Sequence, residues 1–326
     1  MKKTLIALAV LAASTASMAQ VTLYGVADVS VGGSSDASAG LGMAKKDFQL
    51  ISSNVLNNGN SRFGMRGTED LGGGMKALFN FEGGIVLGTG AGNTSGGQLF
   101  SRASWVALEG GFGRVTFGRT LTTSFFSVAS WELTGTANYS VVASQFGFGG
   151  GAGPRDSNVI KYDMKASGFN ASASFIPEAN VGYGTAASPK SKYDLSVGYG
   201  AGPLTASLAY NKVADGNEGT VLGGSYDFGA FKVAASYVNG KSGSGATIAD
   251  GFTIGGSVPM GPWTFTADLA QDTISRPANS TDTNVLLEAK YALSKRTFVY
   301  GVYVMDGKGK TADNVDGYAM GLRHNF

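Results

Sequence analysis

Regular alternation of apolar and polar side chains is the feature that most limits how this chain can fold. Clear examples are the segments 75–82, 193–199, 204–210, 231–237 and 263–269. Successive side chains of a β-strand point to opposite faces, so a period of two residues predicts half-buried strands. No convincing helical pattern follows the first 20 residues. The pattern therefore predicts an all-β fold.

Two kinds of connection separate the predicted strands. Gly and Pro supply the backbone angles of tight reversals, and they mark short turns at 71–74, 109–113, 167–168, 200–203, 228–230, 259–262 and 293–296. Longer polar connections lie at 32–46, 88–97, 120–154, 177–190, 214–218, 241–248, 276–281 and 307–313. These seven turns and eight loops join 16 strands. An even number of strands puts both chain ends on one side, where the first strand can pair with the last and close a barrel.

The first 19 residues have the pattern of a secretory signal peptide. Two lysines precede an apolar run over 5–13, and Ser17 and Ala19 occupy the −3 and −1 positions of a cleavage site. The apolar run is too short to span a membrane. We therefore expect export with cleavage after Ala19, which leaves 20–326 as a single domain.

Composition limits the compartment and the class of partner. The chain has 25 basic and 23 acidic residues, and removal of Lys2 and Lys3 with the leader balances the two signs. A balanced charge gives no reason to expect a nucleic-acid partner. There is no cysteine, so disulfides and cysteine-ligated metals are excluded. We expect no cofactor and no metal.

Hydropathy then narrows the all-β class. No stretch after residue 20 approaches 18 consecutive apolar residues, so no transmembrane helix is predicted. The mean hydropathy is +0.04, which a membrane protein can reach if its strands alternate between lipid-facing and water-facing side chains. The sequence predicts a 16-stranded antiparallel transmembrane β-barrel.

The connection at 120–154 is far longer than the others. A loop of this length in a compact protein is usually functional or disordered. It contains Phe125, Phe126, Trp131, Tyr139 and Phe146, which are too many aromatic residues for a disordered segment. We expect the loop to pack on the inside of the barrel and to narrow the pore.

Several motifs resemble the general porins of β-proteobacteria and Neisseria. They are VTLYGVADVSV after the leader, NSRFGMRGTEDLGGGMKALFNFE, FGRVTFGR and the terminal GLRHNF, and the resemblance covers essentially the whole chain after the leader. It implies a 16-stranded outer-membrane barrel in contact with lipid and lipopolysaccharide, a homotrimer, and a third loop folded into the lumen. It also implies an eyelet in which wall arginines face loop carboxylates, and passive passage of small hydrophilic solutes and ions, with anions preferred in several members.

Basic residues on the predicted strands are the candidates for the eyelet. Arg62 and Arg66 alternate with Phe63 and Met65, and an arginine facing lipid near the midplane would cost about 2–4 kcal/mol. Both arginines should therefore face the lumen. The same reasoning, together with the position of one arginine at the start of the long loop, gives the full basic set of Arg62, Arg66, Lys76, Arg102, Arg114, Arg119 and Lys161.

Basic side chains lining a narrow pore favour anions because the low-dielectric walls focus the field. Glu132 lies near the middle of the long loop and is the candidate acidic partner. Two interpretations stay open, one in which the basic residues control permeation and one in which they only brace the loop. Lys161 stands where the family usually has an arginine, so the charge is kept and the planar guanidinium fork is lost.

The last strand ends on an aromatic residue. Tyr318, Met320 and Leu322 precede Phe326 at alternate positions, and the resemblance implies that the barrel-assembly machinery recognises this strand. Phe326 is also suited to the aromatic girdle at the membrane interface.

Other classes of function have less support. An outer-membrane barrel enzyme needs a catalytic constellation, whereas the chain has one histidine, His324, and no GxSxG motif. We therefore expect no enzyme activity. A binding protein would not need lipid-facing bands. A substrate-specific channel is the main alternative to a general diffusion channel, and it would need a track of aromatic side chains along the lumen.

Overall fold

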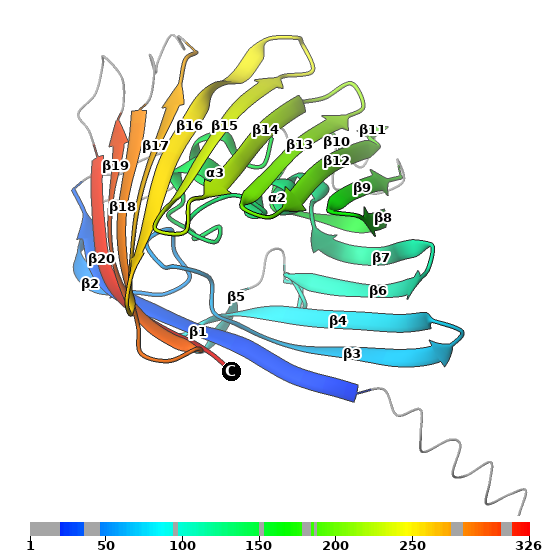
Figure 1. Ribbon diagram of the computed structural model, residues 1–326, viewed down its shortest axis with the longest axis horizontal. Helices are drawn as coiled ribbons and strands as arrows, with labels where there is room; N and C mark the ends of the chain where they lie inside the picture. Colours follow the sequence, from blue (N-terminus) through cyan, green and yellow to red (C-terminus); the bar gives the residue numbers. More distant parts are fainter. Residues whose placement is uncertain are drawn as a thin grey trace, which may run out of the picture.

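The computed structural model describes residues 20–35, 46–93, 97–149, 153–177, 184–185, 188–274, 283–307 and 315–326. The predicted signal peptide at 1–19 lies outside the described residues. Strands dominate the described part, and they curve around a central space (Figure 1).

Sixteen of the strands form the wall: β1 (Gln20–Ser34), β3 (Arg62–Gly72), β4 (Met75–Val86), β6 (Ala103–Gly110), β7 (Gly113–Leu121), β8 (Arg155–Ala166), β9 (Phe169–Ile176), β12 (Lys192–Ala201), β13 (Leu204–Val213), β14 (Glu218–Asp227), β15 (Lys232–Lys241), β16 (Thr247–Met260), β17 (Trp263–Asp272), β18 (Thr283–Ala292), β19 (Thr297–Gly307) and β20 (Val315–Asn325). Two short strands, β2 (Lys46–Ile51) and β5 (Ala91–Asn93), extend the same sheet. A separate small hairpin pairs β10 (Gly184–Thr185) with β11 (Ser188–Pro189).

The sheet closes on itself through its first strand. Neighbouring wall strands all pair antiparallel, and β1 pairs with β3 from Gln20 to Val26 and with β20 from Val26 to Ser34. At the end of this seam, Phe326 and Gly25 exchange two backbone hydrogen bonds of 3.0 Å. The predicted 16-stranded antiparallel barrel is confirmed, and its terminal residue is held in the closing ladder.

The short turns fall where the glycine pattern predicts them. Each of the seven joins two consecutive wall strands. Gly73 and Gly74, which link β3 to β4, have φ angles of 60° and 79°, in the left-handed region that glycine enters without a steric penalty. Residues 36–45 of the first predicted loop, 32–46, lie outside the described residues.

The two faces of the wall differ in chemistry. Large apolar side chains are exposed on the outer face, with Leu23 at 75% and Met320 at 72% of full exposure. On the opposite face Asp28, Lys192 and Asn211 are fully buried. This division matches an apolar surface for lipid and a polar interior. In the described part of the chain no helix is long and apolar enough to cross a membrane.

Two short helices occur in the long loop, although the sequence pattern did not predict any helix. They are α2 (Thr123–Ala129) and α3 (Val141–Phe146). The side chain of Thr122 accepts a hydrogen bond from the Phe125 N–H, and that of Ser140 accepts one from the Ala143 N–H. These N-caps satisfy backbone donors that the first turn of a helix leaves free. Both helices are too short for an apolar period to reveal them.

The closing seam generates the first prediction. A methyl group on Gly25 would lie 2.7 Å from the Arg62 carbonyl oxygen and would also meet the ring of Phe326. Overpacking of this kind costs about 1–3 kcal/mol, so Gly25→Ala should lower the temperature at which the purified barrel unfolds on a heat-modifiability gel. Gly301→Ala is the matched control, because a methyl group there meets no atom within 4 Å. Equal unfolding temperatures for the two variants would contradict the prediction.

Candidate functional site

Four arginines from neighbouring parts of the barrel form a basic surface that we call the arginine wall: Arg62, Arg102, Arg119 and Arg155. Glu82 on β4 lies among them. Its carboxylate is 2.7 Å from Arg102 Nε and 3.4 Å from Arg62 Nε, and it accepts a 2.9 Å hydrogen bond from the Tyr24 hydroxyl. One carboxylate therefore serves two of the four guanidinium groups.

The other two arginines are held by neutral oxygens. Arg119 Nε donates to the Ser101 carbonyl at 2.6 Å, and its Nη1 donates to Ser157 Oγ at 2.7 Å. Arg155 Nε donates to the Arg102 carbonyl at 2.9 Å. Neutral acceptors fix the orientation of a guanidinium without cancelling its charge. The arginine wall is therefore held in place and carries a net positive charge.

The remaining predicted basic residues lie elsewhere. Arg66, four residues further along β3 than Arg62, stacks over the Tyr24 ring at 5.1 Å from its centroid. Lys76 lies beside the turn that follows β3, and Arg114 lies beside the turn that precedes β7, where it is 2.5 Å from Glu109. Lys161 is buried, 3.2 Å from Asp163 and 4.2 Å from the centroid of the Phe126 ring. It packs against α2 and does not join the arginine wall.

Arg155 is a member that the sequence analysis missed. The alternation of apolar residues in β8 indicated Lys161 as the inward basic residue. Asn158 has a φ of 56°, and the pairing of β7 with β8 shifts register between Gly118 and Thr120. This bulge adds one residue to β8. It does not explain the omission, because Arg155 and Lys161 are an even number of residues apart and a strict period of two places both on one face. Arg155 was missed because it is the first residue of β8, directly after the predicted loop. The sequence feature that indicates Arg155 is a basic residue at the point where the long loop ends and the next strand begins.

In the described part of the chain no ion pair joins Glu132 to the arginines. Glu132 is buried in the long loop, where it accepts hydrogen bonds from Thr134 Oγ1 and the Thr136 N–H at 2.6 Å and from Ser140 Oγ at 2.7 Å. These local donors satisfy the carboxylate. Glu132 therefore shapes the loop between α2 and α3.

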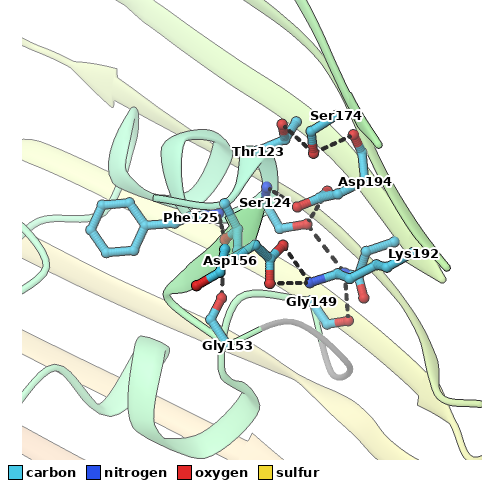
Figure 2. Close-up of polar contacts among 12 residues, drawn as sticks. Thr123, Ser124, Phe125, Gly149, Gly153, Asp156, Ser174, Lys192 and Asp194 are labelled. Atoms are coloured by element: carbon cyan, nitrogen blue, oxygen red, sulfur yellow. Dashed lines mark hydrogen bonds and ion pairs between the residues drawn. The ribbon is translucent and has the colours of Figure 1, made fainter. Parts of the chain in front are cut away.

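Around α2 the long loop is bound to the wall through buried charged and polar groups, which Figure 2 shows. Asp194 on β12 accepts from the Ser124 N–H at 2.9 Å and from Ser124 Oγ at 2.6 Å, at the start of α2. Beside it, Lys192 lies 2.9 Å from Asp156. Asn211 donates to Ser124 Oγ and to the Gly149 carbonyl, both at 3.2 Å. These partners belong to the inward face, so the loop lies inside the barrel.

Residues 131–139 of the loop are bound to further strands of the wall. The Tyr139 hydroxyl donates to Glu288 on β18 at 2.5 Å, and Lys290 donates to the Thr134 carbonyl at 3.0 Å. Burial and the Glu288 carboxylate raise the pKa of Tyr139 well above its usual range, so the phenol keeps its proton and its role as donor. Trp131 packs against Gly223 and donates to Ser207 Oγ at 3.0 Å. The long loop is thus attached to both sides of the interior.

The residues predicted for the assembly signal lie on the outer face. Tyr318, Met320, Leu322 and Phe326 are 49%, 72%, 44% and 54% exposed. Their alternation follows the register of β20 with β1 and β19. The structure thus presents them to the surroundings of the barrel.

A closed barrel with an apolar outer face and a polar, charged interior has the architecture of an outer-membrane barrel protein. The comparisons with known proteins agree. A family model described as Gram-negative porin matches residues 4–311, so this chain belongs to the Gram-negative porin family. It is an outer-membrane protein that lets small hydrophilic solutes and ions diffuse passively. Two of its relatives are named as outer membrane porin proteins.

Individual relatives span the full length of the chain. Outer membrane porin protein 32 of Delftia acidovorans is 34% identical, with 100% of both chains covered. The solved structure of an anion-selective porin from Comamonas acidovorans is 29% identical, covers 95% of this chain and 100% of its own, and superimposes with a TM-score of 0.76. The trimer form of OmpT from Vibrio cholerae shares the fold, with a TM-score of 0.66 at 15% identity over 94% of this chain and 99% of its own.

The buried ion pair beside α2 generates the second prediction. Lys192 and Asp156 are almost completely buried, and removal of one partner from a buried pair costs about 3–5 kcal/mol because the other charge stays desolvated. Lys192→Met should therefore reduce the urea midpoint of the folded barrel strongly, and Lys192→Met with Asp156→Leu should recover much of the loss. Lys212→Met is the control. Lys212 also forms an ion pair, 2.9 Å from Glu218, but this pair lies at the surface, so its loss should change the urea midpoint much less. A double variant no better than the single one would refute the pairing.

Proposed function

We propose that this porin is a homotrimeric channel that prefers anions and that the arginine wall produces the preference. The observation that carries the proposal is the charge balance of the wall. The wall has four guanidinium groups and one carboxylate, Glu82, which pairs with Arg62 and Arg102. The described residues give no ion pair to Arg119 or Arg155. The expected acidic partner, Glu132, is occupied inside the loop.

The physical effect follows from Coulomb's law in a confined space. At an effective dielectric constant of about 40, one guanidinium about 6 Å from a chloride ion contributes about 1.4 kcal/mol, which is about tenfold in local concentration. The long loop occupies part of the lumen and keeps permeating ions near the wall. Arginine is suited to this role because its charge is permanent and its fork is fixed by hydrogen bonds.

A similar protein supports the proposal, because the Comamonas structure is described as an anion-selective porin. A trimeric assembly is supported in the same way by the OmpT structure, which is described as a trimer form. Conductance steps in groups of three in a planar bilayer would test the assembly. Single independent steps from the folded protein would refute it.

The third prediction tests ion preference by reversal potential in a planar bilayer under a KCl gradient. The native channel should prefer chloride. Arg155→Gln should lower the ratio of chloride to potassium permeability severalfold, because it removes a guanidinium that forms no ion pair among the described residues. Glu82→Gln should raise the ratio, because it removes the carboxylate that the wall arginines share.

Arg114→Gln is the matched control for this experiment. Arg114 also faces inward but lies at the short-turn end and pairs with Glu109, so its loss should change the ratio much less. Potassium preference in the native channel, or equal effects of the Arg155 and Arg114 substitutions, would refute the role of the arginine wall.

We also propose that Phe326 and the apolar residues before it in β20 are recognised during assembly. The fourth prediction is that Phe326→Ala reduces the amount of folded barrel in the outer membrane of a Gram-negative host but not the refolding yield in detergent. The backbone seam with Gly25 does not need the ring. Phe228→Ala is the control, since Phe228 is an equally exposed aromatic, 55% against 54%, in a short turn. Equal losses for both variants would refute recognition.

A further inference from the structure

The wall of the barrel is interrupted beside β1. Ile51 of β2 pairs with Ser30, and Arg62 of β3 pairs with Val26. Between these two pairs, three residues of β1 lie beside a segment of ten residues, 52–61, that connects β2 to β3. These ten residues cannot fit within the sheet. We call them the inner turn, because their buried side chains contact the inward-facing residues of β1, β19 and β20.

Ser61 and Asp28 compensate for the missing strand. The Ser61 hydroxyl accepts a hydrogen bond from the Asp28 N–H at 2.9 Å and donates one to the Asp28 carbonyl at 3.0 Å. A single side chain thus takes the place of a strand partner for both backbone groups. The Asp28 carboxylate is fully buried and accepts from the Gly59 N–H at 2.9 Å and from the Tyr300 hydroxyl at 2.7 Å. Asp28 therefore fixes the path of the inner turn.

The tip of the inner turn connects the long loop to the barrel. Asn58 Nδ2 donates to the Tyr139 hydroxyl at 2.7 Å, and Asn58 Oδ1 accepts from Arg323 Nη1 at 2.6 Å. The Asn58 carbonyl accepts from the Asn138 N–H at 3.2 Å. Tyr139 continues the chain of hydrogen bonds to Glu288 on β18. One asparagine thus joins the β20 arginine to the loop.

A second asparagine makes a parallel connection to the arginine wall. The Asn60 carbonyl accepts from Arg62 Nη1 at 3.1 Å, and Asn60 Oδ1 accepts from Asn138 Nδ2 at 2.8 Å. Arg62 and Arg323 also repel each other electrostatically, so a neutral segment between them and the loop keeps both oriented. The inner turn contributes only neutral groups to this contact. It occupies space without cancelling positive charge.

The geometry points to the inner turn as a second constriction element, built into the wall, that together with the long loop sets the width of the pore and the orientation of its arginines. Asp28 is its positioning residue. The inference rests on the proposed anion preference for its effect on selectivity, whereas its effect on pore width is independent of that preference.

The experiment repairs the interrupted strand. Residues 52–61 are replaced by Thr-Ser-Thr, which gives one residue to each of the three unpaired positions of β1. The single-channel conductance should rise because a segment of the lumen is emptied, and the reversal potential under a KCl gradient should move toward zero because Arg62 and Arg323 lose their supports. Heat modifiability on a gel shows that the variant barrel is folded.

Asn58→Ala tests the same inference with the backbone of the inner turn intact. Folded channels of this variant should show higher conductance and a smaller chloride preference, and a double-mutant cycle with Tyr139→Phe should give effects that are less than additive. If Asn58 only stabilised the fold, its substitution would lower the unfolding temperature without changing the conductance or the reversal potential of open channels. Asn217→Ala, at an exposed asparagine in the loop between β13 and β14, is the matched control and should leave both readouts unchanged.

The outcomes separate this inference from the proposed function. Native conductance and native reversal potential in both folded inner-turn variants would overturn the inference while the chloride preference of the native channel stood. A native channel without chloride preference would refute the proposed function, and the rise in conductance would still decide whether the inner turn constricts the pore. If the strand-repair variant does not fold, Asn58→Ala alone decides.

Discussion

Backbone hydrogen bonding in a medium without water is the constraint on which the rest of this structure depends. Each N–H and C=O group within the bilayer must find a partner in the protein, so the sheet has to close. Closure here relies on β1, whose first part pairs with β3 and whose second part pairs with β20. The exchange of two hydrogen bonds between Gly25 and Phe326 completes the seam.

Closure creates a second requirement, because the polar groups on the inward face of the wall also need hydrogen-bond partners. The long loop supplies the partners on one side: α2 meets β12 and β13, and α3 meets β17 and β18 (Figure 1). The inner turn supplies them beside β1, so the interior is a network of hydrogen bonds whose members are stable only when satisfied together.

The sequence allowed the fold to be predicted almost completely because each of its rules is local. A period of two gives the strands, and glycine-rich turns give their ends, so the strand number and the closure follow. The arginine wall was predicted only in part. Arg62, Arg102 and Arg119 were in the predicted set. Arg155 was left out because it is the first residue of β8, directly after the predicted loop, and Lys161 was taken as the basic residue of that strand.

The local hydrogen bonds of Glu132 and the inner turn were not predicted, for a different reason. Glu132 was assigned to the arginines by charge, but three donors within its own loop are closer in sequence and satisfy it. The inner turn depends on a contact between Asp28 and Gly59, which are brought together only by the closed barrel. Contacts of this kind exist only after the chain has folded, and no local pattern in a single sequence encodes them.

The positive charge of the pore depends on which groups the inward-facing carboxylates contact. Five of them hold interior segments or buried lysines in place: Asp194 binds α2, Asp156 pairs with Lys192, Asp163 with Lys161, Glu288 with Tyr139, and Asp28 with the inner turn. These contacts engage the five acids, and Asp156 also attracts Arg119 of the arginine wall electrostatically. Arg119 and Arg155 are held instead by carbonyl and hydroxyl oxygens, which orient them and leave their charge in place. Because the same polar network that stabilises the interior also decides which charges stay unpaired, the stability of the barrel and the ion preference of its pore have a common origin.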